Sequence, residues 1–582
     1  MDLLDLYKRE LQHFRGSARS FAGRHPGVAG MLGADDPDLE RLVEAHAFLT
    51  AGVHARLDVA APAFVEALSD LLLPHVLRSV PAATIVEFTP NLGALRVRQR
   101  IARHRPLLAR AVDGAVCRFR TGFDLDLLPL ELCDAHLDDH IAARPQLRLT
   151  LRIREACRGV LADVERLRIY LHHTTPAQPA TLMQWFCRHC SGLTVLHGGR
   201  ELARLPASAL DPVGLHLEPA LLPWPETAPP VHRLLLERFT LPERAHFLDI
   251  LGLHTLPLDA PTPPRPAADP SLLELTLVFQ FDRPPPLPAA VDASTFRLHC
   301  APAVNLFEAT AEPLHHTPLT REHLLRADGH DPRYTEVHAV TGVTGTDRAR
   351  GVRRGYAPLH DLSPEPGAPR YAVRRAPGVD GGVDTYLLAR DAPGAATFAD
   401  EVLGVDLTCS NRDLPLRLGV GDLAGAPPGA LFRGYTNLTA VTPPVRAPLG
   451  DAAQWHLLAH LGLAARGLHE PAALRALLAL HNAPARLQTP LGRNNARQID
   501  AIRGIERTLV TRVHRGAPVR TVRSRVTLDE GAFASTGHAF LFSALLDQLF
   551  ASAAPFLTAS ELHAVLHPSA AEHPWPPRLA AP

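Results

Sequence analysis

The most informative stretch of this chain reads His232-Arg233-Leu234-Leu235-Leu236-Glu237-Arg238-Phe239-Thr240-Leu241-Pro242-Glu243. Three further segments stand out: Leu6-Tyr7-Lys8-Arg9-Glu10-Leu11, Cys300-Ala301-Pro302-Ala303-Val304-Asn305-Leu306-Phe307 and Cys409-Ser410-Asn411-Arg412-Asp413-Leu414-Pro415. An active site needs a nucleophile, base or metal ligand set within reach of an electrophilic or oxyanion-stabilising group. None of the four segments has that chemistry, so they point away from catalysis.

The composition is that of a globular protein with several domains. The 582 residues suggest roughly three or four domains, and 46% of the residues are hydrophobic while 21% are charged. The 60 Lys and Arg residues balance the 60 Asp and Glu residues, so the formal net charge is +0. No global field therefore draws the whole chain to nucleic acid or to an anionic membrane.

Cysteine usage and the N-terminus favour a reducing cytoplasm. The seven cysteines are odd in number and scattered along the chain, unlike those of a small secreted disulfide scaffold. Asp2, Asp5 and Glu10 fall where a signal peptide needs a basic stretch followed by an apolar one. No run of about 18 uninterrupted apolar residues predicts a transmembrane helix.

Residues 1–80 are predicted to form three amphipathic helices. Apolar residues recur at steps of three and four from Leu3 to Phe21, which indicates the first helix. Asp36-Pro37 offers an N-cap acid and a first-turn proline for a second helix that runs to Leu57. A third helix, from Phe64, should stop at Pro74. These helices could form a bundle of their own or pack against a neighbouring subunit.

Strand patterns dominate the centre of the chain. Strict alternation of apolar and polar residues favours antiparallel sheets with one solvated face. The predicted strands are Thr84–Phe88, Leu147–Ile153, Leu167–Leu171, Leu273–Phe281 and Tyr334–Val343. A short helix is expected around Leu182–Cys190, and Pro257–Pro270 is a candidate linker.

The predicted fold class is α+β and multidomain. Helices return in the last 140 residues, at Trp455–Leu468, Ala472–Leu480 and Ala539–Ala551, with a strand at Val519–Leu528. We divide the chain into an N-terminal helical segment (1–80), a first α+β domain (81–256), a second β-rich domain with long loops (257–440) and a C-terminal α+β domain (441–582). A loop or an inserted hairpin is expected within residues 363–395, which are rich in Gly and Pro.

Cys187-Arg188-His189-Cys190 is the strongest candidate for metal chemistry. Two thiolates at this spacing can bind zinc, but a structural site needs four ligands and no second such pair exists. His172-His173 could complete the set; alternatively, both cysteines are core residues one helical turn apart. HExxH, phosphate-loop and nucleophile-elbow motifs are absent. We therefore predict no catalytic residue, no cofactor and no metal.

The N-terminal histidines have no pattern of their own. His13, His25, His46, His54 and His75 are dispersed along the helical segment without an acid partner four residues away. We expect most of them at the surface or in an interface.

Two kinds of residue are predicted to form interfaces. Tyr7, Leu11 and Phe14 share one helix face, which should be buried against another chain or the following helices. The basic stretch between residues 512 and 525 contributes the remaining candidates, Arg512, Arg515, Arg520 and Arg523. Nucleic acid is not expected there, because aromatic residues for base stacking are missing; docking on an acidic neighbour fits the charge.

The ordered set of motifs resembles the TssF family, also called VasA or ImpG. The resemblance includes Tyr7–Phe14, the helix Asp36–Leu49, Leu73-Pro74-His75, Pro302–Phe307, Ser410–Pro415, Thr442–Arg446 and Trp575-Pro576-Pro577. The family segment with the pattern (Y)RLLxEYFxxPE resembles His232–Ile250, where His232 replaces the tyrosine.

The resemblance implies a structural role in a type VI secretion system. A TssF protein is a baseplate wedge subunit that scaffolds assembly of tube and sheath around the VgrG hub. The implied partners are a TssG-like subunit, a second copy of this chain, TssK and the sheath initiator TssE. Two copies of this chain and one TssG-like subunit would form a 2:1 wedge. The implied location of the protein is the cytoplasm, at a membrane-docked baseplate. Its contact with the membrane would be only through the complex. A wedge of a related phage-tail-like contractile device, and a zinc-dependent enzyme using Cys187 and Cys190, are the alternatives.

Overall fold

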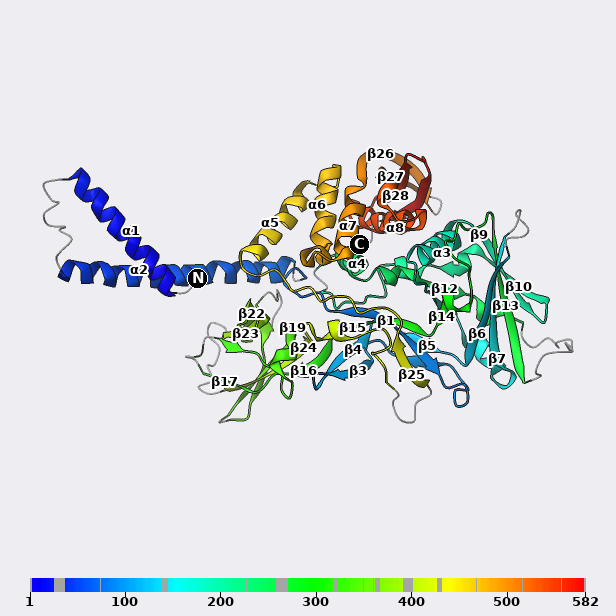
Figure 1. Cartoon of the computed structure of the whole chain (residues 1–582), viewed down its shortest axis with the longest axis horizontal. Helices are drawn as coiled ribbons and strands as arrows, with labels where there is room; N and C mark the ends of the chain where they lie inside the picture. Colours follow the sequence, from blue (N-terminus) through cyan, green and yellow to red (C-terminus); the bar gives the residue numbers. More distant parts are fainter. Residues whose placement is uncertain are drawn as a thin grey trace.

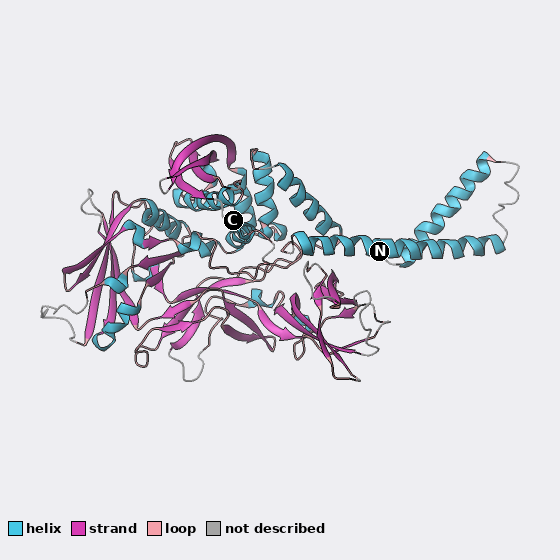
Figure 2. Cartoon of the chain, turned by 180° about the vertical axis from the view of Figure 1, so that it is seen from behind, coloured by secondary structure: helices cyan, strands magenta, loops and turns pink. Residues whose placement is uncertain are grey.

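A long helical arm projects from a body built of several sheets (Figure 1). The computed structural model describes residues 3–25, 37–73, 75–138, 145–225, 228–257, 271–317, 320, 322–348, 350–359, 361, 367–390, 401–425, 432–466, 468–514, 517–555 and 557–579. Seen from behind, most strands run along the lower side of the body, and most helices lie above them together with one further sheet near the C-terminus (Figure 2). The architecture is α+β and multidomain, as predicted.

The arm is a hairpin of two helices. α1 (Leu3–Arg24) packs against the first part of α2 (Pro37–Leu72), where Leu6, Ala47 and Ala51 are buried. The expected third helix is wrong, because its residues continue α2 without a break. Apolar residues recur at helical spacing throughout this stretch. Such periodicity indicates a helix, but it does not indicate where one helix ends and the next begins.

Antiparallel sheets form most of the body. The central sheet has the order β25 (Phe432–Asn437), β1 (Ala83–Pro90), β15 (Cys300–Val304), β4 (Ala115–Thr121), β3 (Pro106–Val112). A second sheet has the order β10 (Arg200–Pro206), β9 (Cys190–His197), β13 (Leu272–Phe281), β7 (Gln146–Arg154), β6 (Leu130–Asp138). A third has the order β11 (Leu210–Asp211), β12 (Phe247–Leu251), β8 (Arg166–Leu171), β14 (Phe296–Leu298). β2 (Gln99–Ile101) pairs with β5 (Leu125–Leu127).

Two further sheets lie beneath the root of the arm (Figure 1). The first has the order β16 (Phe307–Thr310), β24 (Glu401–Ser410), β19 (Glu336–Asp347), β20 (Arg353–Gly355), and β17 (Leu314–His316) also pairs with β24. The second has the order β18 (His323–Leu324), β23 (Val383–Arg390), β22 (Arg370–Pro377), β21 (Ala357–Pro358). The antiparallel β22–β23 pair is the inserted hairpin expected within residues 363–395.

The central sheet joins parts of the chain that are far apart in sequence. β1 pairs with β15, more than 200 residues later, and with β25, more than 300 residues later. Strands from two of the four predicted segments, 81–256 and 257–440, therefore hydrogen-bond in one sheet. The four-way division stays a prediction about sequence organisation.

The C-terminal part combines helices with a four-stranded sheet. α5 (Asp451–Arg466), α6 (Pro471–His481), α7 (Pro490–Asp500) and α8 (Thr536–Ser552) accompany the sheet β26 (Ile502–His514), β27 (Ala517–Asp529), β28 (Ala559–His567), β29 (Glu572–Leu579). α8 also packs against α3 (Ala177–Arg188) in an apolar core, here called the first core, which contains Trp185, Phe186 and Phe540. Gly537 lies so close to α3 that an added Cβ would stand 2.4 Å from Thr181 N. Only glycine fits this approach.

The segment from 230 to 251 holds the body together. α4 (Pro230–Thr240) starts with a proline at its first turn and places Leu234, Leu235 and Phe239 in the same core as α6, α8 and β28. The following β12 joins the third sheet, where Asp249 accepts two hydrogen bonds from Arg168 of β8 at 2.7 and 2.8 Å. One continuous segment therefore ties the C-terminal core to the sheets.

A buried ion pair fixes this segment. The Arg244 Nε lies 2.9 Å from Glu237 Oε2, and both side chains are essentially inaccessible. The other Glu237 oxygen accepts the backbone N–H groups of Leu221 and Leu222, each at 2.9 Å. Arg244 in turn donates to three backbone carbonyls, those of residues 214, 216 and 219. The loop of residues 214–222 therefore supplies hydrogen-bond partners to both members of the ion pair.

Most predicted elements are confirmed and a few boundaries are wrong. The predicted strands in β1, β7, β8, β13 and β27 and the helices in α5, α6 and α8 are present. Tyr334 belongs to a 3-10 turn before β19, and Cys190 begins β9 after α3 has ended. The sequence patterns missed α7, because its basic residues hid a short amphipathic helix capped by Thr489. The linker Pro257–Pro270 lies, except for its first residue, outside the described residues.

We expect Glu237→Gln to destabilise the body strongly. The change leaves Arg244 buried without its counter-ion, which costs about 3–5 kcal/mol in comparable buried pairs. Thermal unfolding followed by circular dichroism should show a clearly lower first transition. Glu201→Gln is the matched control, because its pair with Arg204 is exposed and such pairs contribute about 0–1 kcal/mol. Equal effects of the two substitutions would contradict the role of the buried pair.

Candidate assembly surfaces

The sequence motifs that stood out are structural joints. Asn305 and Asn411 hydrogen-bond to each other twice, at 2.8 and 2.9 Å, although they are 106 residues apart. Both also bind the backbone of Arg118 in β4. The asparagines therefore lock β16 and β24 to the central sheet, which explains the two motifs without any catalytic role.

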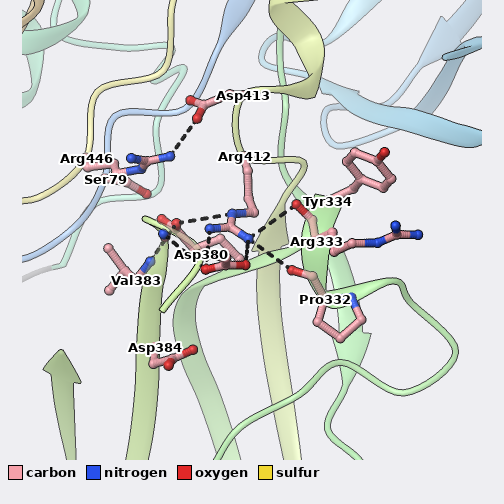
Figure 3. Close-up of polar contacts among 12 residues, drawn as sticks. Ser79, Pro332, Arg333, Tyr334, Asp380, Val383, Asp384, Arg412, Asp413 and Arg446 are labelled. Atoms are coloured by element: carbon pink, nitrogen blue, oxygen red, sulfur yellow. Dashed lines mark hydrogen bonds and ion pairs between the residues drawn. The ribbon is translucent and has the colours of Figure 1, made fainter. Parts of the chain in front are cut away.

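The neighbouring residues of the second motif extend this joint (Figure 3). The Arg412 guanidinium donates to Asp380 at 2.6 Å and to the backbone carbonyls of Pro332 and Arg333 at 3.2 Å. The Asp413 carboxylate accepts a bond of 2.6 Å from Arg446. Each residue of Asn411-Arg412-Asp413 thus holds a different segment of the chain.

The predicted interface residues of α1 face α2. The Tyr7 ring meets Phe48 edge-on with centroids 6.4 Å apart, and Phe14 meets His46 in the same way at 5.0 Å. Tyr7, Leu11 and Phe14 are all half-buried. The structure therefore brings this face against the following helix, one of the two possibilities that the periodicity left open.

An apolar stripe on α2 faces away from α1. Leu42, Leu49 and Val53 are 68%, 66% and 53% exposed. At about 100° per residue these three positions fall within roughly 40° of one another, whereas the buried Ala47 and Ala51 lie on the opposite side. A regular apolar stripe on a projecting helix is typical of a docking surface for another chain.

A second apolar surface lies on α5, at the root of the arm. Trp455, Leu458 and Leu461 are exposed, and Trp455 is 71% accessible. The opposite face of the helix is buried through Ala453, Leu457 and His460. α5 contacts α2 where the arm enters the body (Figure 1). The two apolar surfaces are therefore placed on connected elements.

The predicted arginines lie on the β26–β27 hairpin with different surroundings. Arg512 and Arg523 both pair with Glu561 of β28, at 2.9 and 3.4 Å. Burial raises the pKa of Glu561, but its bonds to the two arginines and to His563 outweigh this and lower the pKa to about 2. Arg520 is exposed, and Arg515 lies outside the described residues.

The Cys187–Cys190 pair packs in the first core. Both side chains contact the apolar cluster around Trp185 and Phe186. Burial raises the pKa of Cys187 to about 12, which disfavours the thiolate that zinc requires. The cysteines do not lie one helical turn apart on one helix, because Cys190 belongs to β9. Among the described residues, neither belongs to a group of three metal-ligating side chains.

One hollow of about 680 Å³ opens beside β1 and β6, lined by residues such as Glu87, Cys133, Arg152 and Arg297. Glu87 pairs with Arg297 at 3.7 Å, and burial raises the pKa of both Glu87 and Cys133. The cysteine thiol is thus kept protonated rather than activated. Among the charged groups that line the hollow, Glu87 and Arg297 pair with each other and Arg152 pairs with Glu274.

Within the described residues, no helix combines the length and the apolar character needed to cross a lipid bilayer. The 36-residue α2 is long enough, but its composition is amphipathic.

Comparison with known proteins gives one consistent result. A family model described as "Type VI secretion system, TssF" matches residues 1–581. The type VI secretion system component TssF1 of Pseudomonas aeruginosa is 30% identical over 603 aligned positions, which cover 94% of each chain.

Two solved structures resemble this fold. A chain of the TssK-TssF-TssG baseplate subcomplex, determined by cryo-electron microscopy, matches with a TM-score of 0.78 and 27% identity, over 93% of this chain and 100% of its own. A chain of the baseplate complex from the type VI secretion system matches with a TM-score of 0.56 and 25% identity, over 100% of both chains. With joints at its motifs and matches along its whole length, the chain belongs to the TssF family of the type VI secretion system.

Proposed function

We propose that this protein is a wedge subunit of a type VI secretion baseplate, where it scaffolds tube and sheath assembly around a VgrG hub. The observation that carries the proposal is the projecting arm with its uncovered stripe of Leu42, Leu49 and Val53. Related chains come from a TssK-TssF-TssG subcomplex and from a baseplate complex. Scaffolding needs rigid spacers and exposed docking faces, and the sheets and the arm supply both.

The wedge comprises two copies of this chain and one TssG-like subunit. TssK and the sheath initiator TssE attach to it, and contact with the membrane is only through the docked complex. A neutral chain gains little from long-range attraction. Recognition must then come from apolar burial and local charge complementarity. Obligate interfaces of this kind bury over about 2,000 Å² in total and are rather apolar.

The same wedge could serve a related phage-tail-like contractile device. Both machines ask the same of this subunit, which is to hold copies at fixed distances around a central hub. Sheath, tube and hub genes beside the gene for this chain would distinguish a type VI system from another contractile device.

Co-expression with the neighbouring TssG-like subunit should give a stable 2:1 complex. Native mass spectrometry of the purified complex measures this ratio directly. Expressed alone, the chain should self-associate or be poorly soluble, because its apolar stripes remain uncovered. A well-behaved monomer that ignores the partner, or another ratio, would overturn the wedge proposal.

Leu49→Asp should prevent assembly without harming the isolated chain. The side chain is exposed here, but in the complex an unpaired charge would enter an apolar contact at a cost of several kcal/mol. Partner affinity should fall by at least about 100-fold, as measured by pull-down and by titration. Leu11→Asp, which faces α2, should lower both affinity and the helical stability of the arm.

Ser20→Asp on α1 is the control, because this side chain is exposed and does not belong to the apolar stripe of α2. Assembly should survive it. Normal assembly of the Leu49→Asp chain would show that the stripe is not a docking surface.

Arg520→Lys should weaken docking although the charge is kept. Arginine forms planar bidentate pairs with carboxylates that lysine cannot form, so we expect an affinity loss of about tenfold. Arg154→Lys at the exposed end of β7 serves as control. Isothermal titration with the partner measures both, and equal affinities would exclude Arg520 from the interface.

A further inference from the structure

Four histidines from four separate elements meet in the interior at the root of the arm. His75 follows α2, His232 lies on α4, His460 on α5 and His481 at the end of α6. The ring centroids of His75, His460 and His481 are 5.4 to 6.3 Å apart, and that of His232 is 4.8 Å from His481. Trp224 stacks on His75 at 4.6 Å and covers one side. Most of the N-terminal histidines were expected at a surface or interface; His75 is an exception within this chain, because its side chain is only 9% exposed.

The hydrogen bonds of two rings fix where their lone pairs point. His460 Nδ1 lies 3.0 Å from the carbonyl oxygen of His456, and His481 Nδ1 lies 2.9 Å from that of Leu477. A carbonyl oxygen only accepts, so both Nδ1 atoms carry the proton. In the neutral rings the Nε2 atoms then hold lone pairs that face the cluster. Metal-binding histidines are oriented by backbone carbonyls in the same way.

Several nitrogen atoms of the cluster have no partner. Both ring nitrogens of His75 and Nε2 of His460 are buried without a hydrogen bond. His481 Nε2 has only the ring of His232, at 2.9 Å. Among the described residues, no carboxylate pairs with any of these four rings. An unsatisfied buried polar atom costs about 1–3 kcal/mol, so the cluster as a set of bare rings is a poor solution.

Their protonation does not supply the missing partner. Burial lowers the pKa of His75 to about 2 and that of His232 to about 4, and neighbouring histidines lower both further. Burial also lowers the pKa of His460 and of His481.

We infer that His75, His460 and His481 bind a structural zinc ion, with His232 as fourth ligand. One nitrogen from each of the first three lies within 4.8 Å of the others. Tetrahedral zinc with Zn–N bonds of about 2.0–2.1 Å needs these atoms about 3.3 Å apart, a contraction that small ring rotations provide. When zinc binds His481 Nε2, that atom can no longer accept the hydrogen bond from His232 Nδ1. The His232 ring is then free to turn toward the ion. Neutral imidazole nitrogens suit zinc better than magnesium or calcium, which prefer oxygen.

The position of the site gives the ion a task beyond the proposed wedge function. Its ligands join the end of α2 to α4, α5 and α6, so zinc would fix the direction in which the arm leaves the body. The zinc assignment itself does not depend on the identity of any partner.

Metal analysis of the full chain, purified alone or with its TssG-like partner, tests the inference. We expect about one zinc per chain, and exchange by Co²⁺ should give the visible absorption of a tetrahedral nitrogen site. His460→Asn should weaken binding by at least about 100-fold, since loss of even an outer-shell partner costs 10–100-fold. His232→Tyr, which removes only the proposed fourth ligand, should weaken binding less and keep the fold.

The double change Cys187→Ser and Cys190→Ser is the matched control and should leave zinc in place. Circular dichroism reports whether each variant is folded, and the unmodified chain supplies the deciding result without any substitution. Absence of zinc after growth in zinc-supplemented medium, together with no tetrahedral Co²⁺ spectrum, would overturn the site. Zinc retained by the His460→Asn chain, or lost from the double cysteine variant, would also overturn it.

Discussion

The buried pair of Glu237 and Arg244 is the constraint on which the body depends. Removing two charges from water is expensive, and the mutual attraction repays it only when the remaining polar atoms are satisfied. Here the loop from 214 to 222 supplies carbonyls to the arginine and N–H groups to the carboxylate. Few other arrangements of this loop would do so. The pair therefore specifies where the loop crosses α4, and α4 in turn sets the C-terminal core against the third sheet.

The same logic explains how far the sequence predicts the fold. Strands such as β7 and β13 were predictable because alternation of side chains is a local property of a half-buried strand. The pairing of β1 with β15 and β25 is decided by contacts across hundreds of residues, which no local period records. The motif residues Asn305 and Asn411 were conspicuous in sequence, but only the structure shows that each completes the hydrogen bonds of the other.

The candidate site was predictable to a similar degree. The apolar face of α1 follows from spacing alone, but spacing cannot say that α2 covers it and leaves Leu42, Leu49 and Val53 exposed. The arginine stretch was visible as charge, yet Glu561 lies about 40 residues further on and binds two of its members. The histidine cluster gave no signal, because its four members come from separate elements. Each looks like an isolated histidine until the helices meet.

The rigid buried contacts and the exposed apolar surfaces therefore lie in different parts of this chain. The body is held by buried polar joints, whose geometry is exacting, while the arm and α5 present apolar stripes, which tolerate adjustment as a partner docks. A joint that adapts would lose the spacing between the sheets, whereas an exposed apolar stripe imposes no such spacing. The root of the arm is where the two meet, and there the chain has gathered buried imidazoles rather than apolar side chains. Directional ligands at that point would fix the angle between the arm and the body.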